Sequence, residues 1–164
     1  SLVERTVPLD GSWRIVIRRK GLAQVIVDTS VIIAILRDEP DASVIRQALG
    51  RPQARRMSAV SYVEAAVVVD SNRNPVLSRR LDDLLRVAEI GVEPVTLNQA
   101  RIAREAYRDF GKGRHRAGLN LGDCFAYALA KEKGETLLFK GDDFCQTDIE
   151  AAEDLGGLGG IRDA

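Results

Sequence analysis

The sequence predicts an α/β fold with helices packed around a central, mostly parallel sheet, and two patterns support this prediction. Short apolar segments with strand character alternate along the chain with longer stretches whose apolar residues recur at helical spacing. Such alternation is typical of parallel sheets, because the crossover between two parallel strands is usually a helix. With 164 residues, of which 45% are hydrophobic, the chain is long enough for one sizeable core and too short for two.

The first half of this pattern contains two strands and three helices. The expected elements are a strand at residues 25–27, a helix at 29–36, a helix from Pro40 to about Gly50, a strand at 57–60 and a helix from Ser61 through Val69. Pro40 suits the first turn of a helix, where its missing N–H is not needed. Ser61 and Glu64 have the spacing of a capping box at the start of the third helix. Because residues 67–69 are all valine, a strand is the competing interpretation there.

The second half continues the alternation and contains one prominent loop. The expected elements are a helix near 76–90, a strand at 92–95, a helix from Thr96 to just before Gly111, a loop at 111–118, a helix from Asn120 through about Lys133 and a strand at 136–139. Thr96 and Gln99 again have the spacing of a cap and its box. The loop mixes glycines with basic residues, and its glycines disfavour a helix.

The two ends of the chain differ from this alternating region, which spans residues 25–155 as one domain. The chain begins with serine rather than methionine, and Trp13, Ile15 and Ile17 alternate with other residues as in a short half-exposed strand. We expect residues 1–24 to be an N-terminal extension or a segment introduced by cloning. Glycines that recur from residue 156 onward predict a loose Gly-rich C-terminal tail at 156–164.

Composition argues against several classes of protein. Lys and Arg together number 24, as do Asp and Glu, so any nucleic-acid affinity must come from local patches rather than net charge. No apolar run approaches the ~20 residues of a membrane span, and the N-terminal segment lacks the apolar centre of a secretion signal. Cys124 and Cys145 are expected to be free thiols and small buried hydrophobic residues of a cytoplasmic protein.

Acidic residues follow the predicted strands or open the predicted helices at four places. They are Asp28 after the first strand, Glu64 after the second, Asp123 in the first turn of a late helix, and Asp142 with Asp143 after the last strand. Since the carboxyl ends of parallel strands share one edge of a sheet, we expect these carboxylates to converge. Each also has a purely structural explanation, as a helix cap, a partner of the helix dipole or a turn residue.

Several carboxylates gathered in one place would repel one another, which predicts a bound cation. Two carboxylates ~4 Å apart repel by about 4 kcal/mol at an effective dielectric constant of about 20. Two divalent cations would neutralise such a cluster, and ligands that are all oxygen select Mg²⁺ or Mn²⁺ over Zn²⁺. The sequence therefore predicts a metal site built from these acids.

Four segments that contain these acids resemble the motifs of PIN-domain ribonucleases, specifically the VapC-type toxins of bacterial toxin–antitoxin modules. The segments are VIVDTS at 25–30, SYVE at 61–64, GDCF at 122–125 and LLFKGDDF at 137–144, in the order and spacing of that family. The resemblance covers about residues 25–150. It implies a PIN-like α/β/α sandwich around the central sheet.

The resemblance also implies an activity, a cofactor and partners. The family's acidic quartet, which is both catalytic and metal-binding, falls on Asp28, Glu64, Asp123 and Asp143. Many relatives carry an acid at the position of Gly141, so Asp143 with its neighbour Asp142 stands in for it, and Asp148 is a weaker substitute. The implied reaction is cleavage of RNA by water that Mg²⁺ activates, with Mn²⁺ able to substitute. A homodimer and a VapB-type antitoxin, whose arginine would pair with the carboxylates, are implied as well.

Basic residues between 101 and 116 are the candidates for binding RNA phosphates. This stretch has six Lys and Arg residues against two acids, a local excess inside a neutral chain. The arginines of the predicted helix fit an ordinary solvated face equally well. Thr29 and Ser30 are further candidates for contact with substrate or with a water ligand. The loop residues predicted to contact RNA are Lys112, Arg114 and Arg116.

Two other functions stay open on the sequence alone. One is a catalytically inactive PIN module that binds RNA or a protein partner, which a complete acidic quartet disfavours. The other is a phosphatase-like enzyme with Asp28 as its nucleophile, since an aspartate after a buried strand also suits phosphoryl transfer. Ser30 stands where such an enzyme would be expected to carry a second acid, and this disfavours the phosphatase.

Overall fold

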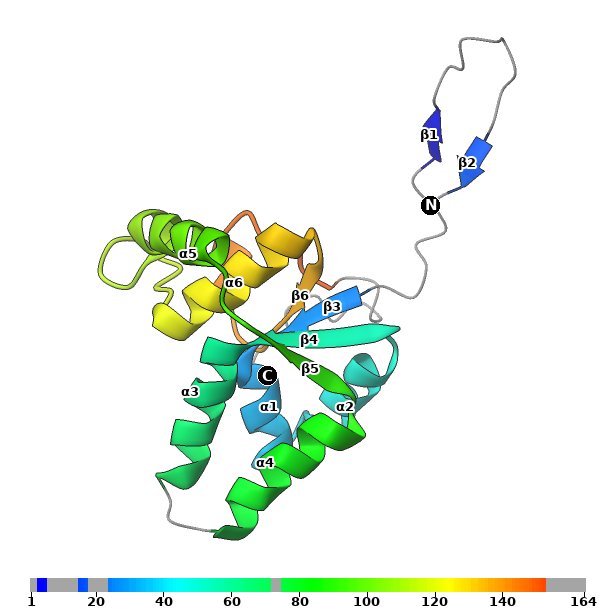
Figure 1. The fold of residues 1–164 in the computed structure, drawn as a ribbon, viewed down its shortest axis with the longest axis vertical. Helices are drawn as coiled ribbons and strands as arrows, with labels where there is room; N and C mark the ends of the chain where they lie inside the picture. The colour runs from blue at the N-terminus through cyan, green and yellow to red at the C-terminus, as the bar shows by residue number, and fades with distance from the viewer. Residues whose placement is uncertain (1–2, 6–14, 18–23, 72–74, 153–164) are drawn as a thin grey trace.

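Four parallel strands form the central sheet of the protein, in the spatial order β5, β4, β3, β6 (Figure 1). The computed structural model describes residues 3–5, 15–17, 24–71 and 75–152. The predicted parallel sheet is confirmed by the pairing of all three strand pairs. The bounds of the strands are β3 Gln24–Val27, β4 Ala54–Ser58, β5 Ile90–Glu93 and β6 Thr136–Leu138.

Alternating side chains along β3 divide the core into two layers, one on each face of the sheet. Val25 and Val27 pack with the layer made of α1 (Thr29–Leu36), α2 (Ala42–Gly50), α3 (Ala59–Asp70) and α4 (Pro75–Val87). Ile26 packs on the opposite face with α5 (Leu97–Phe110) and α6 (Leu121–Lys133). Successive side chains of a strand point to opposite faces, so three adjacent residues reach both layers. The predicted α/β/α sandwich is confirmed, with α5 and α6 above the sheet and α1 to α4 below it in Figure 1.

A separate pair of strands lies near the N-terminus. β1 (Val3–Arg5) and β2 (Ile15–Ile17) pair antiparallel. The predicted strand at Ile15 and Ile17 is confirmed, while Trp13 lies outside the described residues, as does the predicted Gly-rich tail at 156–164. The division of the chain into an extension, a domain at 25–155 and a tail stays a prediction.

The carboxyl ends of the sheet strands lie together along one edge. Val27 is opposite Leu138 in the register of β3 and β6, and Ser58 is opposite Glu93 in that of β4 and β5, so neighbouring strands end together. α6 runs back toward the amino ends, because its last residue is followed almost directly by β6. The first turn of α6 therefore lies at the carboxyl edge, next to the residues that follow β3.

The boundary between β4 and α3 differs from the prediction. α3 begins at Ala59 rather than at Ser61, and β4 has already ended at Ser58. Ser58 is the N-cap, and its hydroxyl accepts a hydrogen bond from the backbone N–H of Val60 at 3.2 Å. Ser61 is buried inside the helix. The predicted capping box of Ser61 and Glu64 is therefore wrong, and Glu64 lies in the second turn of α3.

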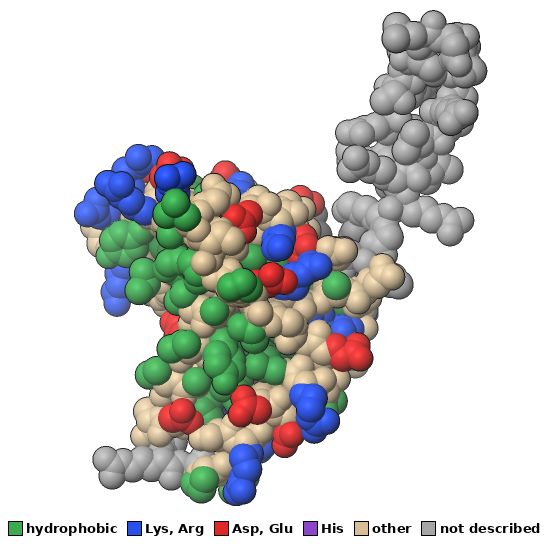
Figure 2. Space-filling view, in the orientation of Figure 1, with side chains coloured by type: hydrophobic (Ala, Val, Ile, Leu, Met, Phe, Trp, Pro, Cys, Tyr) green, Lys and Arg blue, Asp and Glu red, His purple; other side chains and the backbone are tan. Residues whose placement is uncertain are grey.

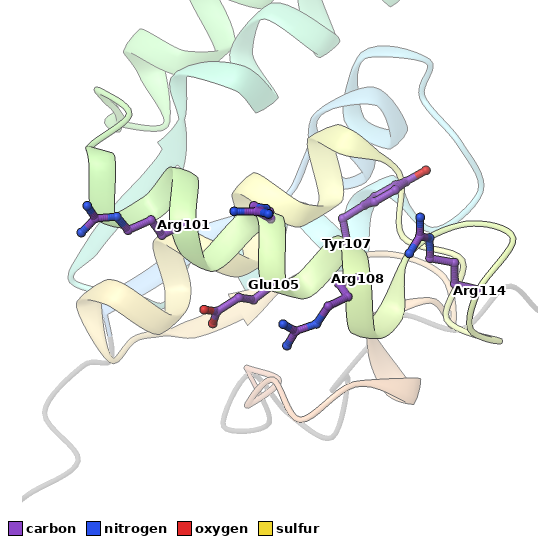
Figure 3. A pocket seen from close by; sticks show the side chains of 6 residues that line it. Arg101, Glu105, Tyr107, Arg108 and Arg114 are labelled. Carbon is purple, nitrogen blue, oxygen red and sulfur yellow. The ribbon is translucent and has the colours of Figure 1, made fainter.

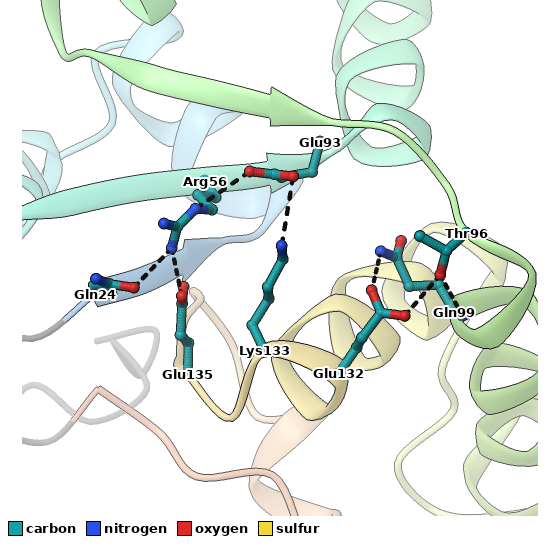
Figure 4. A network of polar contacts seen from close by, with 8 residues as sticks. All are labelled: Gln24, Arg56, Glu93, Thr96, Gln99, Glu132, Lys133 and Glu135. Carbon is teal, nitrogen blue, oxygen red and sulfur yellow. Dashed lines mark hydrogen bonds and ion pairs between the residues drawn. The ribbon is translucent and has the colours of Figure 1, made fainter.

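The prediction missed the first half of β4 because two arginines occupy it. Arg55 donates hydrogen bonds to backbone carbonyls of neighbouring turns. Arg56 donates to the side chain of Gln24 at 3.0 Å. It also pairs with Glu93 at 3.2 Å and with Glu135 (Figure 4). These tertiary partners allow charged residues in a central strand, a position that local propensity disfavours for them.

A second polar network in Figure 4 joins the start of α5 to the end of α6. Glu132 accepts hydrogen bonds from Thr96 Oγ1 at 2.7 Å, Asn98 Nδ2 at 3.1 Å and Gln99 Nε2 at 2.5 Å. Thr96 also accepts a bond from the backbone N–H of Gln99 at 3.0 Å, which confirms it as the helix cap. The predicted cap is therefore present. The side chain of Gln99 donates to Glu132 of α6 rather than returning to the backbone of Thr96, so a contact between helices replaces the second bond of the predicted capping box.

Smaller differences concern element ends. Pro40 precedes α2, whose N-cap is Asp41, and the valines at 67–69 are helical. The helix predicted at 76–90 ends at Val87, and the strand predicted at 92–95 begins earlier, at Ile90. The last strand ends one residue before Phe139. These shifts leave the order and type of the elements as predicted.

Two predictions drawn from composition concern the thiols and membranes. Both cysteines are free, as predicted; Cys124 is buried, whereas Cys145 is exposed, so the expectation that both are buried is wrong for Cys145. Among the described residues, no helix combines the length and the apolar character needed to cross a membrane.

Candidate active site

Asp28 is held rigidly at the end of β3, where it caps α1. The residue is 3% exposed, and its Oδ2 accepts hydrogen bonds from the backbone N–H of Ser30 at 2.9 Å and from the Ser30 hydroxyl at 2.6 Å. Its other oxygen, Oδ1, is buried and has no hydrogen-bond partner among the described residues. Burial raises the pKa of Asp28, although the bonds from Ser30 oppose the rise. A buried carboxylate oxygen without a partner costs free energy unless a ligand completes its surroundings.

Glu64 reaches the same edge of the sheet from the second turn of α3. Its Oε2 accepts a hydrogen bond from the Thr29 hydroxyl at 3.0 Å, and that hydroxyl also lies 3.1 Å from the carbonyl oxygen of Ser61. The Glu64 carboxylate packs against the backbone of Gly122, where an added Cβ would stand 2.0 Å from Oε2. Burial raises the pKa of Glu64, the Thr29 bond opposes this, and the charge of Asp28 adds to it.

Asp123 projects from the first turn of α6 and belongs to a capping box. Asn120 Oδ1 accepts a bond from the backbone N–H of Asp123 at 2.9 Å, and Asp123 Oδ2 accepts one from the backbone N–H of Asn120 at 2.8 Å. Burial raises the pKa of Asp123 to about 7, and the charges that add to the rise are those of Asp28, Glu64 and Asp143. Charges act on one another in this way only when they lie close in space, so the structure brings the four predicted acids together.

The two acids that follow β6 differ in their relation to this group. Asp143 is exposed at the start of a short helix, η1 (Phe144–Gln146), and its charge raises the pKa of both Asp28 and Asp123. Asp142 is not among the charges that act on either of them. Asp143 therefore lies with the other acids, and its role as a ligand stays a prediction.

Asp148, the weaker substitute, has other partners. Its Oδ1 accepts a hydrogen bond from the Tyr127 hydroxyl at 2.6 Å, and its Oδ2 pairs with Lys131 Nζ at 2.9 Å. These bonds lower the pKa of Asp148, whereas the pKa values of Asp28, Glu64 and Asp123 are raised. Asp148 thus fastens the segment after β6 to α6.

The clustered acids fit a divalent cation in their donor chemistry. All four offer carboxylate oxygens, which are the ligands that Mg²⁺ and Mn²⁺ prefer, whereas Zn²⁺ usually binds histidine and cysteine. The buried Oδ1 of Asp28 has lone pairs that no described group uses. Within the described ranges, no group of three or more Asp, Glu, His or Cys side chains is arranged so that it could hold a metal ion. Mg²⁺ does not need three protein ligands, because it keeps several waters and binds through one or two carboxylates together with substrate phosphates.

The two hydroxyl residues predicted to bind substrate are engaged with the acids. Ser30 Oγ donates to Asp28 and accepts a bond from the backbone N–H of Lys140 at 2.9 Å. Thr29 Oγ1 bonds Glu64. Both hydroxyls therefore position carboxylates, and their contact with RNA stays a prediction.

The basic loop between α5 and α6 folds back on itself. Backbone hydrogen bonds of 3.0 Å join Lys112 to Leu119 and Leu119 to Phe110, which closes the loop beside the start of α6. His115 Nδ1 accepts a backbone bond inside the loop, and its ring packs edge-on against Phe110, so this histidine has a structural role. RNA contact stays a prediction for the three exposed basic residues of the loop, Lys112, Arg114 and Arg116.

Two residues that build the site were not predicted as part of it. The sequence indicates Asn120 only as a cap, yet a hydrogen bond from its side chain also acts on Glu64, where it lowers the pKa. Gly122 allows the Glu64 carboxylate to approach α6. The available signal was a glycine in the first turn of a helix, which costs about 1 kcal/mol relative to alanine and often marks a close approach.

Comparison with known proteins matches the region that holds the four acids. The PIN domain family matches residues 25–150. Ribonuclease VapC28 of Mycobacterium tuberculosis is 58% identical over 130 residues, which are 79% of this chain and 98% of that protein. Ribonuclease VapC of Mycolicibacterium smegmatis is 50% identical over 126 residues, which are 77% of this chain and 98% of that protein.

Solved structures share the fold at much lower identity. A crystal structure of Mycobacterium tuberculosis VapC20, described as a sarcin-ricin loop cleaving toxin, matches with a TM-score of 0.63 at 16% identity, covering 76% of this chain and 95% of that chain. A toxin-antitoxin complex from Klebsiella pneumoniae matches with a TM-score of 0.58 at 16% identity, covering 76% of this chain and 92% of that chain. These likenesses are in fold alone.

Proposed function

The chain belongs to the PIN domain family as one of its VapC-type ribonuclease toxins, and from this premise we propose that it hydrolyses RNA at its four clustered acids with Mg²⁺. We refer to Asp28, Glu64, Asp123 and Asp143 as the acidic cluster. We place the activity in the cytoplasm, where the free thiols of Cys124 and Cys145 would stay reduced.

One observation supports the proposal above the others: four separate parts of the sequence bring acids to one edge of the sheet. Asp28 keeps a buried oxygen without a partner among the described residues, and the pKa of Asp123 is raised to about 7 by burial and by the other acids. Such an arrangement contributes nothing to stability, because like charges at close range repel. Groups with strongly shifted pKa values cluster where function requires them.

Each part of the site has a proposed role. Bound Mg²⁺ would supply a Lewis acid that activates water for attack on phosphorus and neutralises charge on the phosphate. Ser30 and Thr29 fix the carboxylates of Asp28 and Glu64 through the hydrogen bonds already described, so the ligands need little reorganisation when cation and RNA bind. The proposed ligands are Asp28, Glu64, Asp123 and Asp143.

Asp28→Asn and Asp123→Asn test this assignment. Each substitution removes a ligand charge and nearly preserves shape, and we expect RNA cleavage in Mg²⁺ to fall about 10²-fold or more. Asp142→Asn is the matched control, because it removes the same charge beside Asp143 and should leave the cleavage rate unchanged. Cleavage is measured with purified proteins, and new RNA 5′ ends are mapped in cells after induction, which also identifies the substrate.

The outcomes separate the alternatives. Full cleavage by both variants, or by the wild-type protein in excess EDTA, would contradict the metal site. RNA binding without products in any divalent cation would identify an inactive module instead. Circular dichroism of each variant shows whether a loss of cleavage reflects chemistry or unfolding.

We further propose that a VapB-type antitoxin silences the site. A fold neighbour of this chain was solved as a toxin-antitoxin complex, and an arginine of such a partner would form charge-assisted hydrogen bonds with the clustered carboxylates. Co-expression of the protein encoded beside this one should suppress both toxicity and RNA cleavage. Cleavage that continues while the two proteins are bound would contradict this partner role.

We also propose that the working unit is a homodimer. Figure 2 shows apolar atoms gathered over the middle of one face, in the region of α3 and β5. A second copy of the chain would remove such a surface from water. The large apolar side chains on α3, on β5 and at the starts of α5 and α6, all between 44% and 68% exposed, are Val63, Val67, Val92, Leu97 and Leu121.

A further inference from the structure

A cavity of about 610 Å³ lies on the surface of α5, outside the acidic cluster (Figure 3). We refer to it as the arginine groove. It is formed by one face of α5 and by the loop that follows. The residues that line it are Arg101, Arg104, Glu105, Tyr107, Arg108 and Arg114.

The arginine groove is strongly basic. Arg101, Arg104 and Arg108 are three and four residues apart, so they share a face of α5 about 10 Å long. Arg108 makes a two-point contact with Asp109 at 2.8 and 3.2 Å, which occupies part of its guanidinium. Over the described part of the chain, Arg101 and Arg104 form no ion pair or hydrogen bond with a carboxylate, and both are exposed. Glu105 is the acid that lines the groove beside them, against four arginines.

Tyr107 adds an aromatic surface to this basic groove. The residue is 39% exposed, and the guanidinium carbon of Arg114 lies 5.9 Å from the centre of its ring. Figure 3 shows Tyr107 extending from α5 and Arg114 from the loop, beside one another at one end of the groove. An exposed aromatic ring flanked by guanidinium groups is typical of surfaces on which unpaired nucleobases stack.

The loop connects the arginine groove with the acidic cluster. The backbone bonds of Leu119 with Lys112 and with Phe110 close the loop directly before Asn120. Asn120 caps α6 and bonds Asp123, a member of the acidic cluster. A polyanion held along α5 would therefore be guided toward the carboxylates, which by themselves repel phosphate.

We propose that the arginine groove binds single-stranded RNA, with phosphates on Arg101 and Arg104 and a base stacked on Tyr107. The choice of RNA as ligand rests on the proposed ribonuclease function. Each guanidinium can bind a phosphate at two points, which lysine cannot. Bases in an RNA duplex are already stacked and lie in grooves that side chains cannot read, so Tyr107 requires an unpaired base. An acidic protein segment would use the arginines and leave the tyrosine ring without a partner.

Binding is measured by fluorescence anisotropy with a labelled, unstructured oligoribonucleotide and the full chain in excess EDTA. We expect Arg101→Gln/Arg104→Gln to bind about 10-fold or more weakly and to reduce the slope of log affinity against log salt by about 1.4, the loss of two phosphate contacts to a single strand. Arg79→Gln/Arg80→Gln is the matched control, because it removes two exposed arginines from α4 in the other helical layer. Its affinity should equal that of the wild-type protein.

The tyrosine is tested in the same assay. Tyr107→Ala should weaken binding about 5-fold to 100-fold, the range for loss of one stacked base, and Tyr107→Phe should retain wild-type affinity. A duplex of the same sequence should bind more weakly than the single strand.

Several results would overturn the proposal. If the double variants in the groove and on α4 lose the same amount of RNA affinity, the binding would depend on net charge alone. Unchanged affinity in Tyr107→Ala, or equal affinity for the duplex, would exclude a single strand as the ligand. Groove variants that bind RNA normally but lose an acidic antitoxin segment would assign the surface to a protein partner.

The design separates this inference from the proposed function, because the assay needs neither metal nor cleavage. RNA bound in the groove by a protein that never cleaves would contradict only the proposed function. If the wild-type protein cleaves RNA and the groove variants still bind RNA normally, only the proposed role of the groove would be contradicted.

Discussion

At the scale of single residues, Gly122 controls how closely Glu64 approaches α6. A Cβ at this position would stand 2.0 Å from Glu64 Oε2, so Gly122→Ala must push the carboxylate away from its place beside Asp123. The end of a glutamate is flexible, and alanine favours a helix over glycine by about 1 kcal/mol, so the free energy of unfolding should stay equal or rise slightly. RNA cleavage should nevertheless fall about 10-fold to 100-fold, as expected when a ligand of a metal site is displaced.

The experiment compares denaturant unfolding and RNA cleavage on the same preparations of Gly122→Ala. Gly50→Ala is a suitable control, because nothing lies within 4 Å of a Cβ built there and α2 is far from the acids along the chain. A Gly122→Ala protein that cleaves RNA at the wild-type rate with unchanged Mg²⁺ dependence would show that the position of Glu64 is unimportant.

The individual acids were more predictable than the residues that hold them. Asp28 and Asp123 stand next to a buried strand and a helix start, and both signals are local in sequence. The hydrogen bond from Thr29 to Glu64 crosses from α1 to α3, so only tertiary packing determines it. The same holds for Asp143, whose charge acts on Asp28 and Asp123 while that of its neighbour Asp142 does not.

At the scale of secondary structure, elements with a clear cap were predicted almost to the residue. Thr96 and Asn120 accept bonds from the third helical N–H, and α5 and α6 begin where these residues predict. β4 was predicted incompletely because the partners that stabilise its arginines come from other strands and from turns that are distant along the chain. The misplaced start of α3 has the same origin, since a strand that ends at Ser58 makes Ser58, and not Ser61, the cap.

Arg56 provides a test of how much its network with Gln24, Glu93 and Glu135 contributes to stability. Its guanidinium is the partner of Glu135, whose side chain is 10% exposed and whose Oε2 already lacks a hydrogen-bond partner among the described residues. Arg56→Met should lower the free energy of unfolding by about 1–3 kcal/mol, because it leaves a largely buried carboxylate unpaired. RNA cleavage by the folded fraction should be unchanged, since Arg56 lies before the carboxyl end of β4.

The double variant Arg56→Met/Glu135→Gln isolates the ion pair from the loss of packing. Removing the unpaired charge should restore part of the stability, so the two effects should be non-additive in urea unfolding. Additive effects would mean that the pair with Glu135 contributes nothing and that Arg56 acts only through Glu93 and Gln24.

At the scale of the whole molecule, the apolar face on α3 predicts the oligomeric state. Val63 and Val67 are four residues apart on one face of the helix and are 56% and 63% exposed. Val67→Asp would place a charge inside the proposed dimer interface and should shift the protein to a monomer in sedimentation equilibrium. Val87→Asp, at a valine of α4 that is 72% exposed, should leave the dimer intact. A wild-type protein that is monomeric at every concentration would contradict the proposed interface.

The acidic cluster also makes the stability of the whole molecule depend on pH. Burial and mutual repulsion raise the pKa values of Asp28 and Glu64, and raise that of Asp123 from 3.8 to about 7. The folded chain therefore binds protons more tightly than the unfolded chain. The stability that this protonation provides is complete below about pH 4 and is lost as the pH rises through about 7.

Bound Mg²⁺ should reverse this loss, because it binds the ionised carboxylates and stabilises only the folded state. We expect the melting temperature in EDTA to fall between about pH 5 and about pH 8, and the rise produced by saturating MgCl₂ to be largest at the upper end. In Asp123→Asn the side chain at this position cannot ionise, so both the fall with pH and the rise with MgCl₂ should be smaller. Asp142→Asn should show both at their wild-type size. All other groups titrate alike in these proteins. The difference in melting temperature between the variants, measured by scanning calorimetry, therefore reports the contribution of the acidic cluster alone. An equal response to Mg²⁺ in Asp123→Asn and the wild-type protein would mean that Asp123 does not share a metal site with Asp28.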